Sequence, residues 1–137
     1  MDDLPAELEA IGREVVDAAL EVHRTLGPGL LESVYEVCLR RELELRGCSV
    51  VKQLPLPVVF KDIRLEAGYR LDLLVDNAVV VEIKAVEALT ASHEAQLLTY
   101  LKLSRRRLGY LINFNAALLK QGLRRKVSGP SFEPSRL

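Results

Sequence analysis

The chain of 137 residues has no tryptophan, two cysteines, two histidines and one methionine. Aromatic residues make up only 5% of it, which leaves little material for a platform that stacks the bases of a single strand. Cys38 and Cys48 form no CxxC pair, and this argues against a structural zinc or iron–sulfur site. We therefore expect two ordinary buried thiols in a reducing compartment.

An excess of one charge is also missing, because 19 Lys and Arg residues balance 19 Asp and Glu residues. Without a global positive field, any binding of nucleic-acid phosphates must be local. No apolar run approaches the length of a membrane span, and the acidic segment 1–5 lacks the apolar core of a signal peptide. We expect a cytoplasmic protein that does not bind membranes. Its size and 49% hydrophobic content predict a single globular domain over residues 1–128, with a flexible tail over 129–137.

The spacing of apolar residues predicts helices at the start of the chain and strands in its middle. In chain order we expect helices over 5–26 and 30–46, strands over 50–60, 63–66, 69–75 and 78–86, a helix over 92–103, and strands over 108–114 and 122–128. The four middle strands read as an antiparallel meander with tight turns. Because Pro55 and Pro57 lack an N–H donor, the first strand should lie at an edge or enter the sheet late. The α-α-β-β-β-β-α-β order predicts an α/β or α+β domain, with one mixed sheet flanked by helices.

Besides Arg70, the apolar strands over 69–75 and 78–86 contain three charged residues, namely Asp72, Glu82 and Lys84. Strand side chains alternate between faces, so Glu82 and Lys84 share one face. If the two strands pair as a hairpin across residues 76–77, both carboxylates and the ammonium converge on one patch. Removing such charges from water costs several kcal/mol per ion unless they are paired. A divalent metal together with a phosphate would satisfy all three, so the pattern predicts a metal site.

The chemistry that suits this group is metal-dependent phosphodiester hydrolysis. Mg²⁺ prefers carboxylates, waters and substrate phosphate, and Asp72 and Glu82 supply the carboxylates. The backbone carbonyl of Ile83 would add a further ligand. Lys84 would orient or deprotonate the attacking water, or offset charge in the transition state. The alternative interpretation is an ordinary Glu/Lys pair on a half-exposed strand.

Four further polar residues lie at helical spacing. Glu32 and Tyr35, three residues apart, follow the break at 27–29, and Glu32 is either a third carboxylate or a first-turn acid favoured by the helix dipole. Gln96 and Tyr100 lie at i and i+4 on one face of the helix over 92–103. Both side chains are able to hydrogen-bond a phosphate or a base, although they would also fit the edge of a core.

Together these residues resemble the PD-(D/E)xK nuclease superfamily, whose α-β-β-β-α-β core carries an Asp and a Glu-x-Lys on its central hairpin. The chain also resembles the small GxxExxY proteins, whose motif appears here as Gly29, Glu32 and Tyr35. The resemblance extends over roughly residues 8–128. One difference is Leu71, which stands where the superfamily name has Pro.

The resemblance implies a restriction-endonuclease-like fold and assigns roles to the candidate residues. Its metal and catalytic core would be Asp72, Glu82 and Lys84, with Glu32 as the helical acidic residue, and its substrate-binding residues would be Gln96, Tyr100 and Tyr35. The implied function is a nuclease that uses Mg²⁺, with Mn²⁺ as a substitute. Its expected substrate is DNA, and RNA is the alternative. The alternative is a catalytically silent module that binds nucleic acid or protein. Because so small a domain offers little surface to a long duplex, we expect a homodimer or a partner protein to assist.

Overall fold

The computed structural model describes residues 4–129, so the tail expected over 129–137 lies outside the described residues except for Gly129. Its elements, in chain order, are α1 (Ala6–Leu26), α2 (Glu32–Leu45), β1 (Val50–Pro55), β2 (Val58–Phe60), β3 (Ile63–Leu65), β4 (Arg70–Val75), β5 (Val79–Lys84), α3 (Ala91–Ser104), β6 (Leu108–Asn113), the 3-10 turn η1 (Leu119–Gly122) and β7 (Leu123–Val127). The single-domain expectation for residues 1–128 stays a prediction. Of the helices between residues 4 and 129, none combines the length and the hydrophobicity that a membrane span requires.

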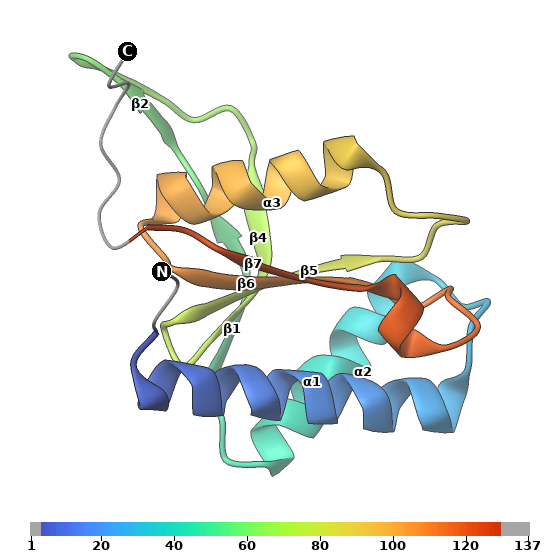
Figure 1. Ribbon diagram of the computed structural model, residues 1–137. Coiled ribbons are helices and arrows are strands. Elements are labelled where there is room, and N and C mark those ends of the chain that lie inside the picture. The colour runs from blue at the N-terminus through green and yellow to red at the C-terminus, as the bar shows by residue number, and fades with distance from the viewer. Residues whose placement is uncertain (1–3, 130–137) are drawn as a thin grey trace.

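Five strands form a mixed sheet in the order β1-β4-β5-β6-β7. The β5–β6 pair is parallel and the other three pairs are antiparallel. Helices α1 and α2 cover one face of this sheet, and α3, which connects β5 to β6, covers the other (Figure 1). The predicted mixed sheet flanked by helices is confirmed, as is the edge position of β1.

The side chains of β5 alternate between the two faces of the sheet, and the apolar interior is therefore divided into two cores. Val79, Val81 and Ile83 pack with α1 and α2, whereas Val80 packs with α3. All six residues of β6 are buried, which agrees with a strand covered on both sides. The central strands therefore have little freedom to move, and polar groups placed on them are held rigidly.

The antiparallel meander expected over 50–86 is wrong in one respect. The segment 50–60, predicted as one strand, is divided into β1 and β2, and β2 pairs only with β3 in a separate two-stranded sheet. The division falls at Pro55 and Pro57, which donate no ladder hydrogen bonds. As a result β1 pairs directly with β4, and the β2–β3 hairpin leaves the sheet as an insertion between them.

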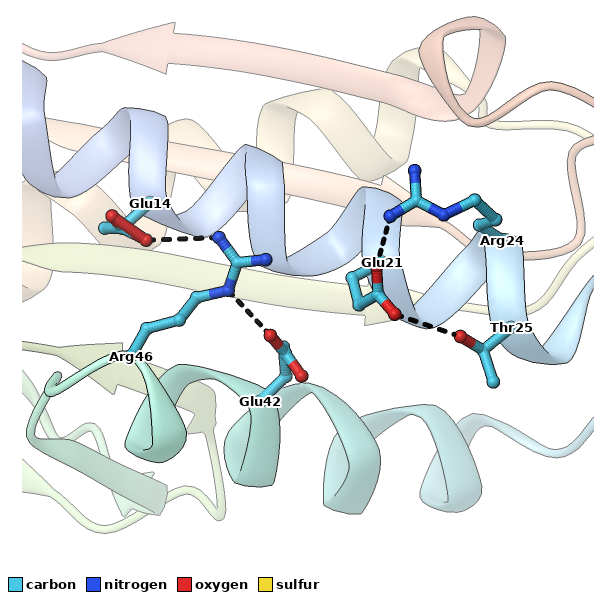
Figure 2. Close-up of polar contacts among 6 residues, drawn as sticks. All are labelled: Glu14, Glu21, Arg24, Thr25, Glu42 and Arg46. Carbon is cyan, nitrogen blue, oxygen red and sulfur yellow. Dashed lines mark hydrogen bonds and ion pairs between the residues drawn. The ribbon is translucent and has the colours of Figure 1, made fainter.

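An arginine joins the two helices on the lower face of the sheet. Arg46, just beyond α2, donates from Nη1 to Glu14 Oε1 of α1 at 3.2 Å and from Nε to Glu42 Oε2 of α2 at 2.7 Å (Figure 2). Exposed pairs of this kind contribute about 0–1 kcal/mol each. They set how α1 and α2 lie against each other more than they set overall stability.

Candidate active site

Regular pairing of β1, β4 and β5 is interrupted at one level of the sheet. The β1–β4 register omits Gln53 and Asp72, and the β4–β5 register stops at Leu73 and Val81, one residue before Asp72 meets Glu82. Gln53 has a φ of 50°, a left-handed conformation that costs a non-glycine residue roughly 1–2 kcal/mol. Backbone hydrogen bonds are thus lost at this level, and side chains take their place.

Asp72 and Glu82 each bond to the other's strand. The backbone N–H of Asp72 donates to Glu82 Oε2 at 3.0 Å, and the N–H of Ile83 donates to Asp72 Oδ2 at 2.8 Å. These two bonds fix both carboxylates between β4 and β5, on the hairpin where they were expected. Since a carboxylate has about four acceptor sites, each retains capacity for a further partner.

Glu82 lies in an unusual electrostatic environment. Its side chain belongs to a residue only 4% exposed. Burial, and secondly the charge of Asp72, raise the pKa of Glu82 to about 8, against the opposing effects of the Asp72 N–H and the Lys84 ammonium. Two carboxylates are therefore crowded together with less positive charge than they need.

A third acidic residue, Glu36 of α2, is connected to Asp72 through the side-chain amide of Gln53. Gln53 Nε2 donates to Glu36 Oε1 at 2.7 Å and to Asp72 Oδ1 at 3.4 Å. Burial raises the pKa of Glu36, and the charge of Asp72 adds to the increase while the Gln53 bond opposes it. The sequence interpretation missed both residues. Glu36 lies one turn beyond Glu32 on the same helix face, a signal that was present, but nothing in the sequence marked Gln53.

Lys84 and Glu32 lie at the margins of the carboxylate group. Lys84 ends β5, and its charge lowers the pKa of Glu82. Glu32 is exposed at the first position of α2, and its charge makes a small contribution to the raised pKa values of Glu36 and Glu82. The structure thus gathers the acidic residues of α2, β4 and β5 around one end of the β4–β5 hairpin.

Tyr100 approaches this group from α3. It is buried, and its pKa is raised first by burial and then by the charges of Glu82, Tyr69 and Asp72. The Tyr69 ring meets the Tyr100 ring edge-on, with centroids 6.0 Å apart. Gln96, one turn earlier on α3, is half-buried. Tyr100 and Tyr69 therefore form an aromatic wall beside the carboxylates.

Tyr35, expected among the substrate-binding residues, lies fully buried in the core between the sheet and helices α1 and α2. Its ring stacks on Phe114 with centroids 4.6 Å apart. The hydroxyl donates to the carbonyl of Gly27 at 2.6 Å and accepts the N–H of Leu30 at 3.1 Å. These contacts indicate that Tyr35 fixes the loop before α2. The sequence did not reveal this role.

The residues present fit a divalent metal ion. Within residues 4–129, no three His, Cys, Asp or Glu side chains gather to hold a metal ion by themselves. Mg²⁺ usually needs only one or two carboxylates, with waters and substrate phosphates completing its octahedron. Asp72 and Glu82 meet that requirement, and a cation between them would offset both the burial and the repulsion from Asp72 that raise the pKa of Glu82.

The mixed sheet with helices on both faces is consistent with a restriction-endonuclease-like fold. The family model of the PD-(D/E)XK nuclease superfamily matches residues 9–126, and the chain belongs to this superfamily. Nucleases of the superfamily generally use divalent metal ions. Searches among curated proteins and among solved structures find no match.

Proposed function

We propose that the protein is a metal-dependent nuclease that hydrolyses phosphodiester bonds. The proposed substrate is DNA, and RNA is the alternative. The observation that carries this proposal is the reciprocal bonding of Asp72 and Glu82 across the interrupted β4–β5 ladder. A fold with no chemical role for these carboxylates gains nothing from burying one of them beside the other, since burial of unpaired charge is costly.

In this proposal Asp72 and Glu82 hold Mg²⁺, or Mn²⁺ as a substitute, with the carbonyl of Ile83 as a further ligand. When bound, the ion would act as a Lewis acid and lower the pKa of a bound water. Lys84, which follows Glu82 by two residues on the same strand face, orients the attacking water or offsets the charge that develops on the phosphate.

The surrounding residues have supporting roles. Gln53 holds Glu36 and Asp72 in fixed positions, as their shared amide bonds indicate. Glu32 adds negative charge at the margin of the site. Gln96 and Tyr100 contact the substrate from α3. Tyr35 acts on the site indirectly, because it fixes the loop over 27–31 that leads into α2.

Positive side chains lie next to Glu36 where a substrate backbone would pass. A surface hollow there is lined by both acidic and basic residues, among them Arg40, Arg41 and Lys52. Lysine and arginine contacts to phosphates supply most non-specific nucleic-acid affinity. This hollow offers the local phosphate binding that a chain without net charge requires.

We also propose three finer assignments. Membership of the GxxExxY proteins is supported by the motif Gly29, Glu32 and Tyr35, in which Gly29 has a φ of 102° that favours glycine. A cytoplasmic location is supported by the two free cysteines. Assistance from a second copy or a partner protein follows from the small size of the domain.

The decisive experiment incubates the purified protein with Mg²⁺ or Mn²⁺ and labelled single-stranded, duplex, flap and junction DNAs and RNA. Lys84→Ala is assayed beside it, with Lys120→Ala, an exposed residue of η1, as the matched control. Cleavage by the wild type and the control, but not by Lys84→Ala, supports the nuclease. Absence of both cleavage and metal binding by calorimetry overturns it and favours the silent binding module.

A further inference from the structure

The β2–β3 hairpin exposes most of its apolar side chains to water. Phe60 is 60% exposed, Ile63 48% and Leu65 47%. Neither strand joins the five-stranded sheet, and β2 projects beyond α3 (Figure 1). The hairpin is therefore the most exposed apolar element of the described chain.

The register of the hairpin places these side chains on one face. Phe60 pairs with Ile63 and Val58 pairs with Leu65, whereas Val59 pairs with Arg64 between them. Residues directly opposite each other share a face, and neighbours along a strand alternate. One face of the ribbon is thus entirely apolar, and Val59 and Arg64 occupy the other.

Such an arrangement needs a partner. An isolated two-stranded hairpin is marginally stable in water at best. Scattered single apolar residues are normal at a protein surface, but here four apolar side chains gather on one face of a ribbon. The apolar face of β2–β3 is therefore expected to be covered when the protein acts.

The dimensions of the ribbon favour a nucleic-acid groove over a second copy of the chain. One face of three paired residues measures roughly 10 Å by 10 Å. This is near 100 Å², far below the ~800 Å² per partner of a stable protein interface. The major groove of a duplex, about 12 Å wide, admits a two-stranded β-ribbon. Proteins that bind the minor groove also insert Phe, Leu and Ile side chains as wedges between base steps.

The hairpin is continuous with the candidate active site. Its two strands connect β1 and β4, which carry Gln53 and Asp72. At its base the N–H of Leu56 donates to the carbonyl of Tyr69 at 2.8 Å, and Tyr69 meets Tyr100 beside the carboxylates. A strand of nucleic acid that reaches Asp72 would pass this base.

Charge on the hairpin also agrees with a nucleic-acid partner. Lys61 lies at the tip with its ammonium over the Phe60 ring, 5.4 Å from the centroid. Arg70 lies at the base and donates to the carbonyl of Gln53 at 3.4 Å. The hairpin also carries Asp62 in its turn and Glu66, which pairs with Arg64 at 2.8 Å. Over residues 58–70 three basic residues thus exceed two acidic ones, and this small positive excess agrees with contacts to phosphates.

We propose that the β2–β3 hairpin is an arm that enters a groove of duplex nucleic acid through Phe60 and Ile63 while the phosphodiester to be cut lies at Asp72 and Glu82. The proposal rests on the proposed nuclease function for the position of the substrate. It identifies the substrate class as a duplex, or a structure with a duplex part, rather than a free single strand.

The test compares Ile63→Ala and Phe60→Ala with Val59→Ala, which removes a β-branched side chain of similar exposure, 59%, from the opposite face. Binding to a labelled 30-base-pair DNA duplex and to one of its single strands is measured by fluorescence anisotropy in a Lys84→Ala background, which prevents cleavage. Hydrolysis of bis(p-nitrophenyl) phosphate, which is too small to reach the arm, is measured with Lys84 present.

We expect the Phe60→Ala, Ile63→Ala double variant to lose duplex affinity about tenfold or more, as for residues central to an interface. Val59→Ala should bind as the wild type does, and hydrolysis of the small phosphodiester should be unchanged in all variants. If Ile63→Ala binds the duplex as tightly as Val59→Ala does, the arm proposal is overturned. It is also overturned if light scattering finds a wild-type dimer that the double variant converts to a monomer, because a second copy then covers the face.

These measurements separate the arm from the nuclease. Duplex binding that depends on Phe60 and Ile63, without metal-dependent hydrolysis of any substrate, supports the arm and overturns the nuclease. Hydrolysis of duplex DNA that the hairpin variants leave unaffected supports the nuclease and overturns the arm.

Discussion

Two hairpins of this chain, β4–β5 and β2–β3, place their side chains in opposite environments. In β4–β5 nearly every residue is buried, and the strands lie between helices on both faces of the sheet. In β2–β3 nearly every residue is exposed, although most of the side chains are apolar. The first hairpin places charged groups in the interior, and the second places apolar groups in water.

Both placements are unfavourable for the isolated chain, and a ligand would relieve each of them. A cation would stabilise the carboxylates of β4–β5, and a surface that removes the apolar face of β2–β3 from water would stabilise that face. In the functions proposed above, the rigid hairpin performs the chemistry and the projecting hairpin selects the substrate. Four measurements would sharpen or break this comparison.

The largest expected effect is the pH dependence of metal-free stability. Because the pKa of Glu82 is raised from 4.5 to about 8, the folded protein keeps a proton in that range that the unfolded chain releases. The free energy of unfolding should therefore be highest near pH 4.5 and fall as pH rises towards 8, by about 5 kcal/mol as an upper limit. Urea unfolding in EDTA at several pH values measures this. Glu82→Gln should flatten the slope, and a slope unchanged in that variant would contradict the assignment.

The second effect contrasts the two hairpins directly by truncation. Leu73→Ala in β4 removes a fully buried side chain and should lower the free energy of unfolding by about 2–5 kcal/mol. Phe60→Ala in β2 should change it by less than about 0.5 kcal/mol, as at other surface positions. Chemical denaturation of both variants gives the comparison. A large loss for Phe60→Ala would show that the arm contributes to the fold, and the contrast would fail.

The third effect concerns activity and uses one substitution at two places in the same hairpin. Asp72→Asn should reduce metal-dependent cleavage about 100-fold or more, while metal-free stability stays equal or rises because one of two neighbouring negative charges is removed. Asp76→Asn is the control, since Asp76 lies at the exposed turn and accepts the Ser49 N–H at 2.8 Å. It should leave cleavage intact. Strong destabilisation by Asp72→Asn would instead indicate a purely structural cluster.

The smallest effect is on the salt dependence of duplex binding. If Lys61 contacts one phosphate, Lys61→Ala should reduce the slope of log affinity against log salt by about 0.9. The Phe60→Ala variant should weaken binding without changing that slope, because it removes no charge. Titrations at four salt concentrations measure both. Equal slopes for Lys61→Ala and the wild type would place Lys61 away from the phosphates.

Periodicity was sufficient to predict the helices, the central hairpin and the edge position of β1, because these depend on alternation of apolar residues and on missing N–H donors. It did not reveal the separation of β2 from β1. That break depends on where β1 finds its partner, and β1 passes over its neighbours in the chain to pair with β4.

The candidate site was predictable only for residues on regular strands and helix faces. Asp72, Glu82 and Lys84 follow from alternation within β4 and β5. Gln53 does not, because its place depends on a left-handed backbone within a strand, which no periodic pattern contains. Tyr35 was expected to bind substrate, whereas its ring is buried and the loop backbone satisfies its hydroxyl in the core. Spacing along a helix does not show which partner a tyrosine hydroxyl takes.

The left-handed conformation of Gln53 has a consequence for how this sequence could have evolved. Glycine or asparagine would occupy that conformation with less strain, so selection for thermal stability alone would replace the glutamine. Neither residue could reach both Glu36 and Asp72 with its side chain as Gln53 does. Gln53→Gly would thus relieve the strain of the backbone and at the same time remove the amide that joins Glu36 to Asp72.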